Sequence, residues 1–187
     1  TAEDTVLVLL SGGASALFEL PLVPEEELRS VTQQLLASGA DITEMNTVRK
    51  RLSAVKGGKF AALCAPAHIF SIVLSDVLGD RLDMIASGPS APDRSTTEDA
   101  QRIAEKYALR LSAQTQALLS APPAPFPGNV ETRITGSVRQ LCLAAAERCR
   151  ALGFTPHILT DCLSCTARDA GAFLAAIART HYRDGRK

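Results

Sequence analysis

Short apolar runs alternate along the chain with longer segments of helical periodicity. Residues 5–10, TVLVLL, are apolar almost throughout and stop at a Ser-Gly-Gly turn, which is typical of a buried parallel strand. A second run of this kind, HIFSIVLS, ends at Ser75. The segments TRITGS, at residues 132–137, and TPHILT, at residues 155–160, predict two further strands.

Between these runs, apolar residues recur at the spacing of a helix. The segment after Pro24 places Leu28, Val31 and Leu35 on one side, has acids in its first turn and stops at Gly39. Asp41 is suited to cap the next helix, which we expect to end at Gly57-Gly58. Further helices are predicted at residues 59–63, 97–109, 112–120, 138–152 and 166–181.

This alternation of strands and helices predicts an α/β fold. Parallel strands are apolar along their whole length because helices cover both faces of their sheet. We therefore expect three layers, with a mostly parallel sheet between two layers of helices. The length of 187 residues suits a single domain, with residues 77–94 and the breaker APPAPFPGN as loops.

Composition and charge exclude several classes of protein. Twenty basic residues balance twenty acidic ones, so no broad positive field is available for nucleic acid. No apolar run is long enough to span a membrane, and the first residues carry no basic signal-peptide region. Five cysteines, an odd number, indicate reduced thiols rather than a disulfide framework. We therefore expect a cytoplasmic protein. The abrupt apolar start further suggests a piece of a longer chain.

Two segments carry residues that suit an anionic ligand. In LLSGGASAL, residues 9–17, small side chains allow backbone N–H groups to approach an anion, although a turn without a ligand is the alternative. The segment lacks the Gly-Lys-Ser/Thr ending of a Walker A loop. In NTVRKRLSAVKGGK, residues 46–59, polar and basic side chains gather on one helix face, for which a solvated surface is the alternative.

A third segment, SDVLGDRLDMIASGPSAPD, follows the second strand directly. Ligands of open parallel sheets bind beyond the carboxyl ends of the strands, so Asp76 and Asp80 are candidates to hold Mg²⁺ on a nucleotide. An acid-rich surface loop is the alternative. Loops of this length in compact domains are more often functional than idle.

In this order and spacing, LLSGGASAL, EMNTVRKRLSAVKGGK and VLSDVLGDRLDMIASGPSAPD resemble the type II glycerate kinases. The resemblance continues through TGSVRQLCLAAAERCRALGF and ILTDCLSCTARDAG, and so spans nearly the whole chain. It implies a Rossmann-like fold and ATP-dependent phosphorylation of D-glycerate to 2-phosphoglycerate, with Mg²⁺. The family's upstream segment and its C-terminal MOFRL domain have no counterpart here. We therefore expect that this chain is an incomplete larger domain and that it is inactive alone. A homodimer is one assembly that the resemblance allows.

The resemblance also implies roles for individual residues. Those expected to bind substrate or ATP are Ser11, Gly12, Gly13, Ser15, Asn46, Lys50, Ser87 and Gly88. Those expected to carry catalysis are Lys56, Arg49 and Asp76. The Mg²⁺ ligands would be Asp76 and Asp80.

Two other functions are considered. Some members of the resembling family are named hydroxypyruvate reductase, and a reductase would need a dinucleotide site. The GxGxxG fingerprint is absent after the first strand, which disfavours this function. The second alternative is a non-catalytic fragment that binds a ligand or a partner.

Overall fold

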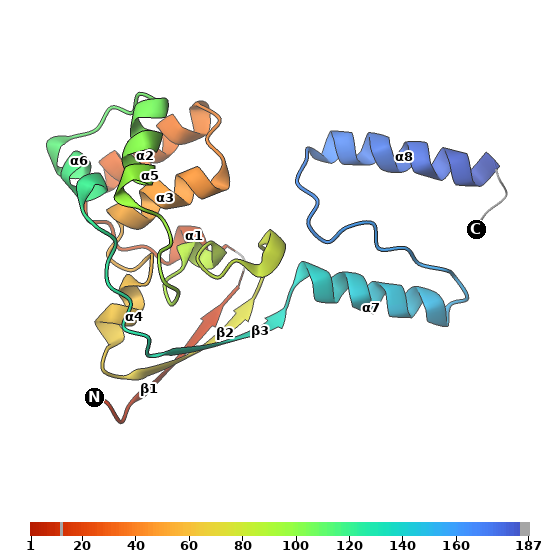
Figure 1. The fold of residues 1–187 in the computed structure, drawn as a ribbon, viewed down its shortest axis with the longest axis horizontal. Helices are drawn as coiled ribbons and strands as arrows, with labels where there is room; N and C mark the ends of the chain where they lie inside the picture. Colours follow the sequence, from red (N-terminus) through yellow and green to blue (C-terminus); the bar gives the residue numbers. More distant parts are fainter. Residues whose placement is uncertain (12, 184–187) are drawn as a thin grey trace. The chain divides into compact units, whose positions relative to one another are not determined.

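The computed structural model describes residues 1–11 and 13–183. Its internal contacts divide the chain into two compact units, Thr1–Ser137 and Val138–Lys187, each of which is described by itself (Figure 1). The elements in chain order are β1 (Thr5–Leu10), α1 (Ala14–Leu17), α2 (Glu25–Ala37), α3 (Ile42–Leu52), α4 (Lys59–Cys64), β2 (His68–Leu74), η1 (Leu78–Asp80), η2 (Ile85–Ser87), α5 (Thr97–Lys106), α6 (Ala113–Ser120), β3 (Val130–Gly136), α7 (Val138–Ala151) and α8 (Ala167–Arg183).

The first unit is built on a three-stranded parallel sheet in the order β1-β2-β3. Thr5 pairs with His68, and Ile69 pairs with Val130, so all three strands run side by side in one direction. This confirms the α/β class and the three parallel strands expected at these positions. The carboxyl ends of the strands therefore lie at one edge, where the loops after β1 and β2 begin.

The two faces of this sheet differ sharply in exposure. On one face Ile69, Ser71 and Val73 of β2 are buried. On the opposite face of β1, Leu7 is 60% exposed and Leu9 is 69% exposed. Parallel sheets normally bury both faces, whereas within the first unit the face that carries these leucines is open.

A bundle of α2, α3, α5 and α6 forms the main core of the first unit, and Figure 1 shows these helices grouped together. The helical spacing predicted after Pro24 is confirmed, because Leu28, Val31 and Leu35 of α2 are all buried. They pack in one cluster with Val48, Leu52, Ile103 and Leu119. Burial of each such side chain contributes roughly 1.5–3 kcal/mol to folding.

Helix α3 begins as predicted but ends earlier than expected. Asp41 caps it in a capping box with Glu44. Its last residue is Leu52, not a residue next to Gly57, because Ser53 is extended and the chain there bridges to Pro21. The Lys59 ammonium donates to the carbonyls of Lys50, at 2.8 Å, and Ser53, at 2.6 Å. A cation thus satisfies the free carbonyls where the helix stops.

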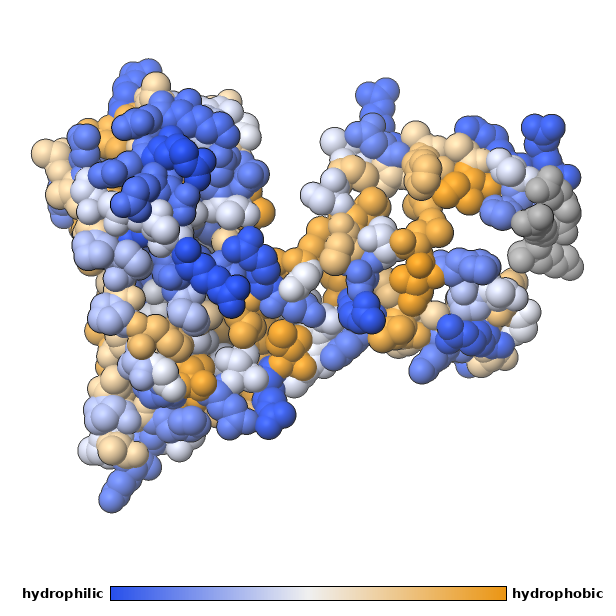
Figure 2. Space-filling view, in the orientation of Figure 1, coloured by the Kyte–Doolittle hydropathy of each residue, from blue (hydrophilic) through white to orange (hydrophobic). Residues whose placement is uncertain are grey.

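In the second unit, α7 and α8 confirm the two helices predicted there. The strand predicted at residues 155–160 is wrong: this segment has no regular structure, since in the described chain it forms no ladder with another strand. Large apolar side chains of this unit reach the surface, as the orange colour in Figure 2 shows. They include Leu141, Leu159 and Phe173, all more than half exposed. Over the part of the chain that the structure describes, no helix combines the length and apolarity needed to cross a bilayer.

Glu44 links α3 to the end of α5. Its carboxylate accepts from Lys106 Nζ at 2.7 Å and from the Tyr107 hydroxyl at 2.6 Å. The hydrogen bond from Lys106, then that from Tyr107, lower the pKa of Glu44 from 4.5 to about 2. The link therefore stabilises the fold fully above the ordinary pKa of a glutamate and is lost as the pH falls towards the folded value.

We predict that Glu44→Gln makes unfolding less sensitive to acid. Between pH 4.5 and about 2 the wild-type free energy of unfolding should fall more steeply than that of the variant, because only the wild type must protonate Glu44 to lose the link. Urea titrations across this range measure both slopes. Glu26→Gln, at an exposed position of α2, is the matched control and should keep the wild-type slope. Equal slopes for all three proteins would contradict the prediction.

Candidate functional site

The residues predicted to bind anions do not form one surface, because α3 distributes them to two places. Asn46 and Lys50, one turn apart, point towards the segment of residues 81–93. Arg49 points instead towards the segment of residues 11–19, which follows β1 and is called loop 11–19 below. Lys56, four residues beyond the end of α3, joins Arg49 there.

Loop 11–19 is held by two cations on a single carbonyl group. The Ser15 carbonyl accepts from Arg49 Nη2 at 2.7 Å and from Lys56 Nζ at 2.8 Å. Lys56 also donates to the Phe18 carbonyl at 2.9 Å, and its side chain is fully buried. Glu19 lies beside both cations, with its Oε2 3.4 Å from Arg49 Nη2 and 3.7 Å from Lys56 Nζ.

Burial and neighbouring charges act against one another at Lys56. Burial lowers the pKa of its ammonium, Glu19 raises it, and Arg49 lowers it again, so that the net pKa is below the ordinary value. Glu19 is therefore the group that favours the charged form of Lys56. Glu19 is not among the residues predicted from the sequence; the signal that could have found it is an acid within the otherwise apolar stretch FELPL.

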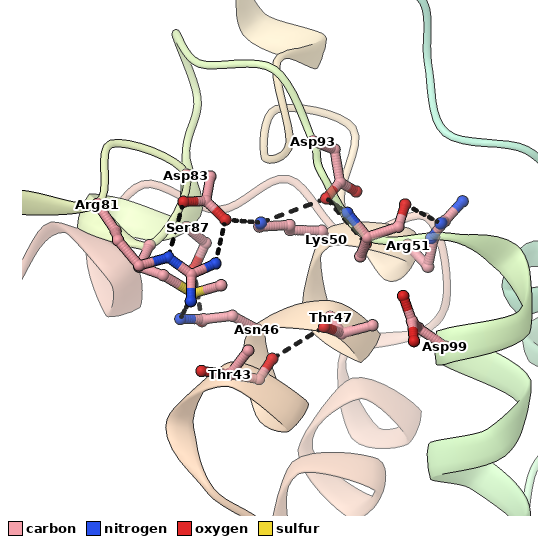
Figure 3. Close-up of polar contacts among 12 residues, drawn as sticks. Thr43, Asn46, Thr47, Lys50, Arg51, Arg81, Asp83, Ser87, Asp93 and Asp99 are labelled. Atoms are coloured by element: carbon pink, nitrogen blue, oxygen red, sulfur yellow. Dashed lines mark hydrogen bonds and ion pairs between the residues drawn. The ribbon is translucent and has the colours of Figure 1, made fainter.

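The second set of residues surrounds Lys50 (Figure 3). Its fully buried ammonium lies 3.5 Å from Asp83 Oδ2 and 3.3 Å from Asp93 Oδ1. Asp83 also accepts from Arg81, whose Nη2 is 2.9 Å away. Burial alone would raise the pKa of Asp83, but the hydrogen bond from Arg81 and the charge of Lys50 outweigh it and lower the pKa. Asp83, which is not among the residues predicted from the sequence, thus balances a buried lysine together with Asp93.

Asn46 and Ser87 meet in the same region. The Ser87 hydroxyl donates to Asn46 Oδ1 at 2.9 Å, and the Asn46 amide lies 3.5 Å from the sulfur of Met84. Ala86, Ser87 and Gly88 are all left-handed, with φ of 53°, 62° and 66°. A Cβ on Gly88 would lie 3.0 Å from the backbone of Asp83, so the turn requires glycine there.

This turn is tied to the start of α4 through the backbone. Gly57 N donates to Ser87 O at 3.0 Å, and Gly58 N donates to Gly88 O at 2.7 Å. Ser87 and Gly88, both predicted to bind substrate or ATP, are buried in these contacts. Consecutive non-glycine residues in this conformation are strained, and such strain is concentrated at functional sites.

The remaining predicted residues lie at the carboxyl edge of the sheet. Ser11 and Gly13 are exposed directly after β1, Asp76 is exposed two residues after β2, and Asp80 is half-buried in η1. Gly12 lies outside the described residues. Leu10, Val73, Ala14 and Ile85 pack in one small core that brings the ends of these loops together. The edge therefore gathers the loops after β1 and β2, as the sequence predicted.

No cluster of three or more metal-binding side chains occurs in residues 1–11 and 13–183. Within the same residues the carboxylates of Asp76 and Asp80 have no hydrogen bond or ion pair. In phosphoryl-transfer sites Mg²⁺ keeps several waters and uses only one or two carboxylates together with phosphate oxygens. Two free carboxylates at the sheet edge fit that donor set.

Three cavities adjoin these groups. One, of about 210 Å³, is bordered by Lys50, Asp83 and Arg94, and a second, of about 310 Å³, by Asp80, Asp83 and Arg94. The third, of about 660 Å³ and called the larger cavity below, lies between α2 and loop 11–19 and has Glu19 and Arg49 in its wall. Loop 11–19 therefore borders the larger cavity, whereas the Lys50 set borders the two smaller ones.

Comparison with known proteins gives consistent matches. A family model described as "Domain of unknown function (DUF4147)" matches residues 1–120. D-glycerate 2-kinase of Thermotoga maritima is 50% identical over 179 residues, which are 95% of this chain and 43% of that protein. A protein of Agrobacterium vitis named as a hydroxypyruvate reductase is 40% identical over 184 residues, 94% of this chain and 47% of that protein.

The structural comparison agrees with the sequence matches. The crystal structure of glycerate kinase from Thermotoga maritima superposes with a TM-score of 0.85 at 49% identity, covering 97% of this chain and 44% of that one. The chain thus spans less than half the length of the relatives it matches.

We predict that Lys50→Met lowers the free energy of unfolding by about 3–5 kcal/mol, because it leaves Asp83 and Asp93 as buried charges without their shared cation. Arg81→Met is the matched control: its contact to Asp83 is shorter, at 2.9 Å, but its side chain is 47% exposed. That variant should lose about 1 kcal/mol or less. Chemical denaturation measures both, and equal losses would show that burial is not the deciding factor.

Proposed function

Since the chain belongs to the DUF4147 family, which supplies the N-terminal domain of type II glycerate kinases, we propose that the protein containing it phosphorylates D-glycerate. ATP donates the γ-phosphoryl group, and the 2-hydroxyl of glycerate accepts it to give 2-phosphoglycerate. The observation that carries the proposal is the half-identical D-glycerate 2-kinase of Thermotoga maritima. The chain alone is inactive in this proposal, because the rest of the active site belongs to parts of the protein outside it.

We place the ligands at the carboxyl edge of the sheet. Phosphate or the glycerate carboxylate lies against Ser11, Gly12, Gly13 and Ser15, whose small side chains let backbone groups approach an anion. The exposure of Ser11 and Gly13 in the described chain supports this placement. Ligands of open parallel sheets bind at this edge in general.

Asp76 and Asp80 would hold Mg²⁺, whose charge would offset that of the phosphate groups. Asp76 also orients the acceptor hydroxyl from the end of β2. Because phosphoryl transfer offers the protein little covalent chemistry, the remaining work is positioning and charge balance. The exposed Asp76 is suited to contact ligands directly.

The basic residues of α3 and of the α3–α4 turn mainly support the loops that bind the ligands, rather than contacting the ligands themselves. Lys50, Lys56 and Asn46 are buried and contact protein groups, so we propose that they fix the loops that carry the ligands. Ser87 and Gly88 belong to the same support. Arg49, which is only partly buried and borders the larger cavity, is the cation best placed to reach an anionic oxygen as well.

Reduction of hydroxypyruvate is the second candidate, favoured by the name of the Agrobacterium vitis relative. The segment after β1 reads SGGAS rather than the GxGxxG of a dinucleotide site. The kinase proposal therefore has the stronger chemical basis. A non-catalytic binding role is the third candidate, and it predicts activity in neither a kinase assay nor a reductase assay.

We predict that the full-length protein consumes ATP only with D-glycerate and Mg²⁺, and that its product is accepted directly by enolase, which acts on 2-phosphoglycerate but not on the 3-phospho isomer. This chain alone should show no turnover. A parallel assay with hydroxypyruvate and NADH or NADPH tests the reductase. Product that reaches enolase only through a mutase would contradict the 2-phospho assignment, and activity in neither assay would favour a binding role.

We further predict that Asp76→Asn in the full-length protein lowers kcat about 100-fold or more. Removal of one group that stabilises a transition state has an effect of this size in other enzymes. The melting temperature should stay within the error of the measurement, because Asp76 is exposed. Glu105→Gln removes one exposed acid from α5 and serves as the matched control. Wild-type turnover in Asp76→Asn would remove Asp76 from the reaction.

A further inference from the structure

Loop 11–19 has little local structure of its own to fix its backbone. Its helix α1 has four residues, too few to be stable in isolation, and Gly13 before it is left-handed with φ of 84°. Ala16, Leu17 and Gly13 are exposed, and the apolar contacts of the loop are made with other elements: Ala14 packs on the small core at the strand ends, and Phe18 lies edge-on to Phe60. The position of the loop must therefore depend on contacts from other elements.

The strongest such contacts come from the two cations behind the loop. Arg49 and Lys56 donate to the Ser15 carbonyl at 2.7 and 2.8 Å, the range of charge-assisted hydrogen bonds, and Lys56 adds the Phe18 carbonyl at 2.9 Å. These bonds act on the backbone, not on side chains. They fix both ends of α1 against the α3–α4 segment.

Two cations that share one acceptor repel each other, and a third group must compensate. Glu19 is this group, since its side chain is only 13% exposed and its carboxylate lies near both Arg49 and Lys56. Its distances of 3.4 and 3.7 Å are longer than those to the carbonyls. Glu19 therefore balances the charge of both cations and accepts a long hydrogen bond from Arg49, while the carbonyls of the loop take the short hydrogen bonds.

We propose that Glu19 is a positioning residue: it holds Arg49 and Lys56 on the carbonyls of Ser15 and Phe18 and so fixes loop 11–19 in the geometry that binds an anionic group of the substrates. The identity of the ligand in this proposal rests on the function proposed above. The clamp itself, defined as Glu19, Arg49 and Lys56, is a property of the fold alone and is measurable without turnover.

The test compares Glu19→Gln, which keeps the shape but removes the charge, with Glu105→Gln. Glu105 is exposed on α5 and lies outside the clamp and outside the wall of the larger cavity, so it is a matched control. Hydrogen exchange is measured for peptides covering loop 11–19 and, as an internal reference, for α2. kcat and KM for ATP and for D-glycerate are measured in the full-length protein.

For Glu19→Gln we expect exchange in loop 11–19 to rise about tenfold and at least one KM to rise about tenfold, the effect of weakening charge-assisted hydrogen bonds, while α2 exchanges as in the wild type. The KM effect should exceed the kcat effect, because the loop binds but does not react. Glu19→Asp should restore part of both, and Glu105→Gln should change neither.

Unchanged exchange in loop 11–19 would overturn the clamp, whatever the kinetics. Faster exchange with wild-type KM values would overturn the assignment of this loop to ligand binding. If the wild-type protein shows no kinase activity, the proposed function fails, but the exchange experiment still decides the clamp. Should Glu19→Gln fail to fold, Arg49→Gln, which leaves the buried Lys56–Glu19 pair intact, replaces it in the exchange experiment, where the same rise in loop 11–19 is expected.

Discussion

Positive charge in residues 49–59 is the constraint on which the first unit depends, because three of its cations, Lys50, Arg51 and Lys56, are buried almost completely. A buried cation without partners is far more costly than a buried apolar side chain. Each of these three cations is therefore in contact with acids or carbonyl groups from a different part of the chain. Lys50 has acids from residues 83 and 93, Lys56 has carbonyls from loop 11–19, and Arg51 has the carbonyls of Ser95 and Ala121.

These partners come from both sides of α3 in the sequence, which explains how one short helix organises so many loops. Loop 11–19, the left-handed turn at residues 86–88 and the residues just before α5 all contact α3 or the turn that follows it. The helix bundle supplies the apolar core, whereas the polar partners of α3 set the positions of the loops. Stability and the geometry of the candidate site thus have a common origin.

Much of the fold could be predicted from the sequence, because hydrophobic periodicity and capping residues are local signals. The strand at residues 5–10 and the capped start of α3 at Asp41 are examples. The end of α3 could not be predicted, since it depends on a bridge to Pro21 and on Lys59. In the site, the sequence identified the basic residues but not Glu19 or Asp83, whose importance arises only when distant segments meet around a buried charge.

The clamp on loop 11–19 acts on main-chain oxygens, and this has a consequence for divergence within the family. A carbonyl group is present whatever the side chain, so the residue at position 15 is free to change without loss of the hydrogen bonds from Arg49 and Lys56. Substrate preference could therefore drift through side chains on the loop while its path is conserved. Selection would fall instead on Glu19, Arg49 and Lys56, whose side chains hold the main chain of the loop.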